Sequence, residues 1–391
     1  MNKGNILNFI LTFLFWIRLQ KIINQFQKIS ALTFLFSFPS IFFFPHTTIL
    51  YPVKEIPGWV PAPIPQYSPP PFHPLIKVTN LSPIPESCFN QTNPEYPTLV
   101  NLLTNAVVFN NATIVTSNYF IQSFTNYYSN IRKTPFKVDF STYKVVDQAI
   151  TLFHAYLKTY YHFIIETFPL ILCFSKEIIE NSVLLHGRVL KNQFNELCSL
   201  LNLNFKEKIF VRNPVYVKKL YVANSNIFIE FNANAVRHFR HLMLEKCNAT
   251  NLKATQNVYY NRPKNRRILN FNELKAALKN EFSNEEFIEP NQMSMAEQVV
   301  FWRKTRFAMM VHGSIFSNFI FMHPNTAYLE FNILVCRSPA QKLCQSFGIH
   351  IYSMLFKRHC LNRSMHADIP DVILAVKRIF KMLETQDLSL Y

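Results

Sequence analysis

One short segment joins an apolar run to residues that can bind an anion. It consists of Phe307–Val311, then His312, Gly313 and Ser314, with Asn318 a little further on. Gly313 permits a backbone turn that a Cβ atom would block, and the amide groups at the start of a following helix would then point outward. The imidazole of His312 would lie at the carboxyl end of a buried strand, where α/β proteins form their sites. A polar turn without a ligand fits the same spacing.

A second segment pairs an imidazole with a carboxylate. His162 and Glu166 are four residues apart, so a helix would place them on one face. A carboxylate beside an imidazole orients the ring and raises its basicity, which suits a general base. An exposed ion pair on a helix surface is the alternative. Apolar residues at 163–165 favour a face close to the core.

Basic residues gather after a predicted strand that ends near residue 260. Arg262, Arg266 and Arg267 fall within six residues, just before a predicted helix. Guanidinium groups bind phosphate oxygens through paired N–H donors. The segment therefore predicts a phosphate contact, and an exposed basic loop is the alternative.

Two carboxylates lie close to these segments in the chain. Glu297, followed by Gln298, stands three residues after Ser294, which is the spacing of a capping box at a helix start. Glu330 lies in a strand-like run, where a buried carboxylate needs a polar partner. The hydroxyl groups of a ribose could be that partner.

Predicted strands and helices alternate along the chain from about residue 98. Strands are predicted at 137–146, 183–185, 209–211, 219–223, 258–260, 286–288, 307–311, 327–331 and 349–352. Helices are predicted at 159–174, 190–201, 235–247, 270–282, 294–305, 340–347 and 371–383. This alternation predicts an α/β fold with two Rossmann-like lobes, each a parallel sheet covered by helices, and a ligand at the carboxyl ends of the strands.

Composition narrows the class of protein. The 391 residues carry a net charge of +17, and 49% of them are hydrophobic, which is ample for a core. The five glycines form no G-x-G-x-x-G or Walker motif, and no D-x-D or C-x-x-C is present, so no metal site or cofactor is expected. The charge suits anionic substrates, an anionic membrane or nucleic acid, but its even spread favours a solvated basic surface without nucleic acid. Cys336, Cys344 and Cys360 could supply a disulfide, and Cys173 is predicted to be a buried free thiol.

The first hundred residues predict a membrane anchor and a spacer. We expect a basic cytosolic segment at 1–30, a signal-anchor helix at 31–50, a proline-rich stem at 51–97, and lobes at 98–255 and 256–391. A cleaved signal peptide is the alternative. The positive charges that precede the anchor would leave the bulk of the chain in the lumen of the Golgi or endoplasmic reticulum, as a single-pass type II protein. Five N-x-S/T sequons, at Asn80, Asn90, Asn111, Asn248 and Asn362, are compatible with that location.

In their order and spacing these segments resemble glycosyltransferase family 61 over roughly residues 100–385. The matching pieces are Tyr161-His162 through Glu166 to Pro169, Asn261-Arg262, Arg267 to Asn270, Ala296-Glu297-Gln298, His312-Gly313-Ser314 with Asn318, and Ala327 to Glu330. The sequence departs from the common pattern of the family at Asn261, Ser314, Glu166 and Leu170, which leaves the donor and the acceptor open.

The resemblance implies an inverting, metal-independent enzyme of the GT-B type. Such an enzyme would move a sugar, with GlcNAc or xylose favoured, from a UDP-linked donor to a hydroxyl of a protein or glycan. By this resemblance Arg262, Arg266 and Arg267 neutralise the diphosphate, while Gly313 and Ser314 bind its oxygens beside His312. Glu297, Gln298, Asn318 and Glu330 belong to the donor side, and His162 with Glu166 lines the acceptor side. A catalytically inactive binding protein of the same fold, or a basic membrane-anchored binding protein, are the alternatives.

Overall fold

The computed structural model describes eleven stretches of the chain. They are 60–71, 76–77, 98–110, 113–116, 119–124, 127–133, 143–153, 157–224, 231–332, 339–355 and 364–385. The chain divides into two compact units, 1–49 and 50–391, and every described residue belongs to the second. The predicted cytosolic segment and the whole of the predicted anchor lie outside the described residues. Among the described helices, none is both long enough and apolar enough to cross a bilayer.

The first sheet of the described chain is mixed, in the strand order β6-β5-β4-β3-β10-β7-β8-β9, with β1 also paired to β3. Its strands are β1 Val60–Pro61, β3 Leu99–Val108, β4 Ile114–Val115, β5 Tyr119–Phe124, β6 Tyr127–Lys133, β7 Lys144–Leu152, β8 Val183–His186, β9 Glu207–Phe210 and β10 Val215–Asn224. The half from β10 to β9 is parallel, as predicted. The half from β3 to β6 is antiparallel, and β3 pairs antiparallel with β10, neither of which was predicted.

Three helical segments that accompany this sheet were predicted, and α2 was not. The helices are η3 His162–Thr167, η4 Phe168–Cys173, α2 Lys176–Asn181, α3 Lys191–Leu200 and α4 Ala233–Lys246. The helix predicted at 159–174 is instead a wide π-helical turn followed by a tight 3-10 segment. Pro169 stands at the start of the second piece, where its missing N–H group costs nothing.

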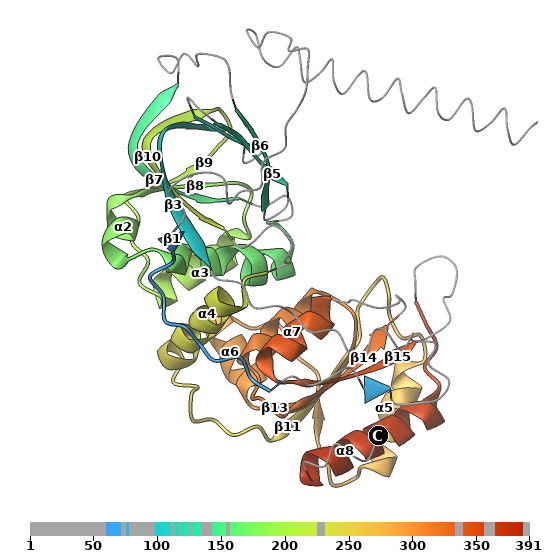
Figure 1. Ribbon diagram of the computed structural model, residues 1–391. Coiled ribbons are helices and arrows are strands. Elements are labelled where there is room, and N and C mark those ends of the chain that lie inside the picture. The colour runs from blue at the N-terminus through green and yellow to red at the C-terminus, as the bar shows by residue number, and fades with distance from the viewer. Residues whose placement is uncertain are drawn as a thin grey trace, which may run out of the picture. The chain divides into compact units, whose positions relative to one another are not determined.

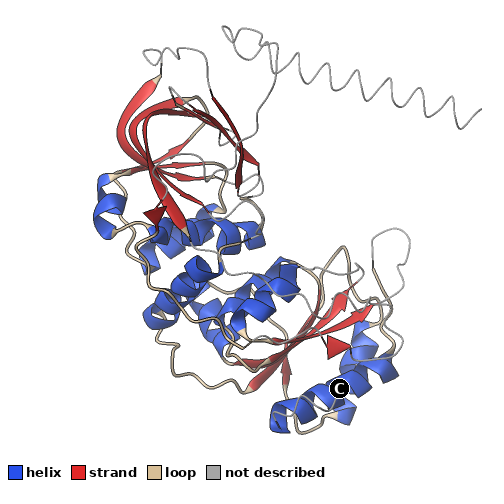
Figure 2. Ribbon diagram, in the orientation of Figure 1, coloured by secondary structure: helices blue, strands red, loops and turns tan. Residues whose placement is uncertain are grey.

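The second sheet of the described chain is parallel throughout, in the order β12-β11-β13-β14-β15-β2. Its strands are β2 Ile76–Lys77, β11 Gln256–Tyr260, β12 Phe287–Ile288, β13 Thr305–Val311, β14 Ala327–Asn332 and β15 His350–Leu355; its helices are α5 Phe271–Glu281, α6 Met295–Arg303, η5 Ser314–Phe321, α7 Pro339–Phe347 and α8 Ile369–Thr385. Figures 1 and 2 show α6 and α7 on one face and α5 and α8 on the other. The alternation predicted for this half is confirmed.

Two separate cores enclose the second sheet because alternate side chains of its strands point to opposite faces. Phe307 and Met309 of β13 pack with α5 and α8. Ala308 and Met310 of the same strand pack with α6, α7 and η5, in a cluster that continues into Phe163 of η3. One continuous apolar core therefore supports η3 and η5 together.

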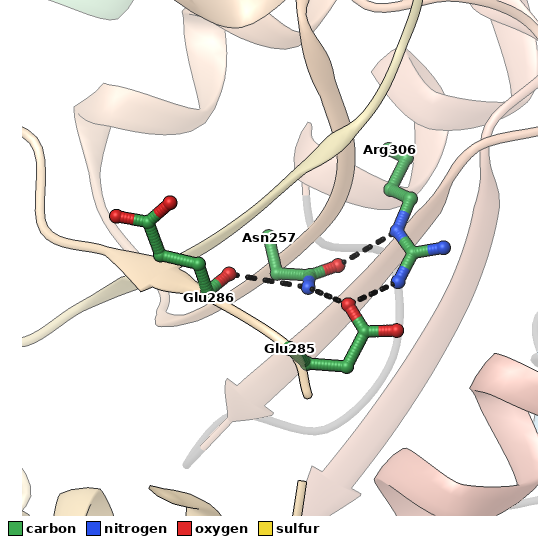
Figure 3. Close-up of polar contacts among 4 residues, drawn as sticks. All are labelled: Asn257, Glu285, Glu286 and Arg306. Atoms are coloured by element: carbon green, nitrogen blue, oxygen red, sulfur yellow. Dashed lines mark hydrogen bonds and ion pairs between the residues drawn. The ribbon is translucent and has the colours of Figure 1, made fainter. Parts of the chain in front are cut away.

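An ion pair stabilises the amino-terminal edge of the second sheet (Figure 3). Arg306 donates from Nη2 to Oε2 of Glu285 at 2.6 Å and from Nε to Oδ1 of Asn257 at 3.0 Å. Asn257 in turn donates from Nδ2 to Glu285 at 2.9 Å and to the carbonyl of Glu286 at 3.2 Å. These contacts tie the starts of β11 and β13 to the residues just before β12. The candidate site lies at the opposite edge of the sheet, where the strands have their carboxyl ends.

Part of the predicted proline-rich stem is folded into this unit. We call residues 60–71 and 76–77 the strap. Its strand β1 pairs with β3 of the first sheet, and β2 pairs with β15 of the second. Ala62 and Ile64 are buried, and Asn234 of α4 accepts from the amide of Tyr67 at 2.9 Å and donates to the carbonyl of Pro65 at 3.0 Å. Over these residues the stem is a packed segment and not a free spacer. Its backbone groups hydrogen-bond to β3, to β15 and to the side chain of Asn234.

Candidate active site

A buried carboxylate holds the imidazole of His312. Nδ1 of His312 lies 2.7 Å from Oε1 of Glu330, and the two side chains are 15% and 2% exposed. The residues come from neighbouring parallel strands, since Glu330 of β14 is opposite Met310 of β13. A ring that donates its Nδ1 proton to a carboxylate keeps Nε2 as its acceptor. The partner of Glu330 is thus an imidazole, where the sequence suggested the hydroxyl groups of a ribose.

Arg262 crosses the backbone directly after this strand. Its Nη1 group donates to the carbonyl of His312 at 3.2 Å. A Cβ atom on Gly313 would lie only 2.6 Å from the same Nη1 atom. The φ angle of Gly313 is 176°, which any residue can adopt. A glycine at this position therefore serves to make room for the guanidinium group.

Gly313 precedes the first turn of η5, as predicted. The carbonyl of Gly313 accepts from the amide of Phe316 at 3.1 Å, and the carbonyl of Ser314 accepts from Oγ of Ser317 at 2.7 Å. The first amides of a helix have no partner within the helix and carry its positive dipole end. Arg262 and these amides lie at one edge of the sheet, which makes the edge electropositive.

The loop that carries the other two arginines is closed at its base by one side chain. Asn261 donates from Nδ2 to the carbonyl of Ile268 at 2.9 Å and accepts from its amide at 2.8 Å. Arg266 has a φ angle of 60°, in the left-handed region, and the side chain of Arg267 is exposed. The structure places Arg266 and Arg267 in the same closed loop as Arg262.

The predicted pair on η3 is formed. Nδ1 of His162 lies 2.5 Å from Oε2 of Glu166. The carboxylate is 6% exposed and the imidazole 30%, so the ring presents an edge to solvent while its partner is buried. This burial distinguishes the pair from the surface ion pair that the spacing also allowed.

Aromatic rings connect the two histidine–carboxylate pairs. The ring of Phe316, in η5, has its centroid 5.3 Å from that of His312 and 5.1 Å from that of Tyr161. The ring of Tyr161 then meets that of His162 edge-on at 5.3 Å. Tyr161 and Phe316 were not predicted as site residues. The signal that could have found them is a bulky aromatic residue next to His162 and another between Ser314 and Asn318.

The remaining predicted residues divide into two groups. Glu297 is exposed and forms the capping box of α6, accepting from the amide and hydroxyl of Ser294 at 2.8 and 2.7 Å. These hydrogen bonds hold the pKa of Glu297 below its usual range. Gln298 and Asn318 instead contact each other and the hydroxyl of Tyr160, a residue that the sequence analysis passed over. None of these contacts excludes the predicted role on the donor side.

One buried thiol and one buried phenol lie near Glu330. Burial, and then the charge of Glu330, raises the pKa of both Tyr328 and Cys344. Both groups therefore stay neutral and provide no counter-charge, which makes His312 the basic partner of this carboxylate. Cys344 is a free thiol and so is Cys173, as predicted for the latter; Cys336 and Cys360 lie outside the described residues.

Comparison with known proteins agrees with the motif order. The family model described as Glycosyltransferase 61 matches residues 160–329. The match begins at Tyr160, just before the His162–Glu166 pair, and ends next to Glu330, so it spans most of the site described above. No curated protein matches the chain. The family match confirms the resemblance: residues 160–329 match glycosyltransferase family 61, and this match supports glycosyltransferase activity.

Proposed function

We propose that this glycosyltransferase transfers a sugar, GlcNAc or xylose, from a UDP-linked donor to a hydroxyl of a protein or glycan with inversion at the anomeric carbon. The observation that carries the proposal is the junction after β13, where Arg262 lies against the His312 carbonyl in the space left by Gly313. Two Rossmann-like halves of the GT-B type would place the donor at this edge of the second sheet. The acceptor would approach η3.

The donor diphosphate would bind beside the loop that carries three arginines. Arg262, Arg266 and Arg267 share one closed loop, and the first amides of η5 follow Gly313. Guanidinium groups and helix amides bind phosphate oxygens through charge-assisted hydrogen bonds. Such fixed donors stabilise a departing diphosphate without waiting for solvent to reorient. With these groups in place, the proposed reaction needs no metal ion.

The chemistry divides between the two histidine–carboxylate pairs. In the transfer, the acceptor oxygen forms a bond to the anomeric carbon while the bond from that carbon to the diphosphate oxygen breaks. The leaving diphosphate takes the electron pair of the broken bond, and the arginine loop neutralises its charge. His162, oriented by Glu166 and partly exposed, is placed to accept the proton of the acceptor hydroxyl. His312, oriented by Glu330, lies on the donor side.

We also propose the location expected from the sequence, a single-pass type II protein of the Golgi or endoplasmic reticulum with its catalytic part in the lumen. Support comes from the basic residues that precede the apolar run 31–50 and from one sequon in the described chain. Asn248 is exposed, with a φ angle of 51°, at the turn that ends α4. Such a turn leaves room for an attached glycan.

The test uses the full chain, purified in mild detergent and with EDTA present. Binding of UDP is measured by calorimetry, and UDP release is measured with a panel of UDP-sugars and hydroxyl acceptors. We expect UDP to bind, one donor to support transfer, and Arg262→Ala to weaken UDP binding by about 10-fold or more. Full transfer by Arg262→Ala would refute the diphosphate assignment. UDP binding without transfer from any donor would favour the inactive binding protein.

A further inference from the structure

The hydroxyl of Tyr160 joins the acceptor-side helix to the donor-side elements. It lies 2.7 Å from Oδ1 of Asn318 and 3.0 Å from Oε1 of Gln298. Asn318 also donates from Nδ2 to Oε1 of Gln298 at 3.1 Å. The three side chains therefore form a closed polar triangle.

Each corner of this triangle stands on a different element of the site. Tyr160 lies two residues before His162, the first residue of η3. Asn318 lies in η5, whose first residue, Ser314, directly follows the Gly313 that adjoins Arg262. Gln298 lies in α6, whose start is held by a second contact, from the amide of Met295 to a carboxylate oxygen of α3 at 2.6 Å. The triangle thus links a residue just before the His162–Glu166 helix to η5, which begins two residues after His312, and to α6.

The triangle consists of groups that remain neutral. Burial raises the pKa of Tyr160 far above the physiological range, so the phenol keeps its proton and can donate it. Asn318 is 2% exposed, and Gln298 uses its own amide group to donate to the carbonyl of Met293 at 3.1 Å. The oxygen and nitrogen atoms of both amide side chains therefore form hydrogen bonds within the protein, although the sequence predicted a role for both residues on the donor side.

We propose that Tyr160 is a positioning residue, whose hydroxyl sets the placement of the His162–Glu166 pair relative to His312 and Arg262. This inference rests on the proposed transferase function. Transfer requires the acceptor oxygen and the anomeric carbon to meet in a narrow range of distances, so a small displacement of the base lowers the rate of the chemical step more than it lowers donor binding.

The test compares two variants that each remove one tyrosine hydroxyl. Tyr160→Phe removes the triangle contact, and Tyr216→Phe removes a 2.7 Å bond to Oδ1 of Asn105 in the first sheet, away from the site. We expect Tyr160→Phe to lower kcat by about 5–10-fold with the donor KM changed by less than about two-fold. Asn318→Ala should have a similar effect, and the double variant should lose little more than either alone. Tyr216→Phe should leave kcat unchanged.

A second measurement reports on position without requiring turnover. Diethyl pyrocarbonate acylates neutral imidazole, and mass spectrometry resolves the rate at His162. We expect that rate to change at least about three-fold in Tyr160→Phe and to stay the same in Tyr216→Phe. An inactive wild-type chain with this change retained would refute the proposed function but keep the positioning role. Unaltered kcat in an active enzyme, or an unaltered acylation rate in an inactive one, would overturn the positioning role.

Discussion

Replacing Gly313 by alanine should weaken donor binding while leaving the fold intact. The added Cβ atom would lie 2.6 Å from Nη1 of Arg262, so the guanidinium group must retreat by roughly 0.8 Å to reach ordinary contact. Its 3.2 Å bond to the His312 carbonyl would then exceed hydrogen-bond length. The displaced guanidinium group would lose a charge-assisted hydrogen bond to the donor diphosphate, which contributes about 1.5–3 kcal/mol, so we expect UDP affinity to fall about 10–100-fold.

Two other glycines provide controls for this experiment. At Gly187 a Cβ atom would meet the side chains of Leu157 and Phe153 at 3.4 Å, so Gly187→Ala should change neither stability nor UDP binding appreciably. At Gly348 the φ angle is +69° and a Cβ atom would lie 2.9 Å from Cβ of Pro70. Gly348→Ala should therefore cost about 1–2 kcal/mol of unfolding free energy without acting on UDP directly.

Calorimetric titration with UDP and urea unfolding of the three variants separate these effects. The reasoning predicts that only Gly313→Ala loses affinity and that only Gly348→Ala loses substantial stability. Wild-type UDP affinity in Gly313→Ala would show that Arg262 does not depend on the space at Gly313. A loss of stability as large as that of Gly348→Ala would show that the substitution disturbs the backbone instead.

Three further changes test other parts of the structure. Glu330→Gln should lower the rate of UDP release by about 10-fold or more with UDP binding largely retained, because the neutral amide no longer orients the imidazole of His312 through a charge-assisted hydrogen bond; an unchanged rate would contradict this. Arg306→Leu should cost about 1 kcal/mol in urea unfolding, since the partly exposed bond to Glu285 is lost, with transfer activity unaffected. Burial lowers the pKa of His323, so the unfolding free energy should fall as the pH drops below about 6.5, and His323→Gln should reduce that slope.

The second sheet could be predicted from the sequence because local signals agreed there. Its central strand β13 is a continuous apolar run from Phe307 to Val311, and the helix starting after Ser294 has a complete capping box. The antiparallel strand β3 was missed because it is partly exposed and mixes polar and apolar residues. In β3, buried and exposed positions alternate irregularly, which weakens the period on which the prediction relies.

The functional residues were easier to identify than their partners. His162 and Glu166 share a helix face, so their spacing alone predicted the contact. His312 and Glu330 meet through adjacent strands, and nothing in the spacing between them indicates that pairing. The role of Tyr160 depends on contacts with two distant elements, which only the tertiary structure reveals.

The strap has a consequence for how the protein is made. Strand β2 lies near the start of the folded unit, yet its partner β15 is synthesised only when the chain is almost complete. Strand β2 therefore has no strand partner in the second sheet until nearly all of the enzyme has emerged from the ribosome. Pairings between such distant residues form slowly, and segments that await them are exposed to misassembly. Completion of the second sheet is thus a late event in biosynthesis, and it places the strap among the last segments to become resistant to proteolysis.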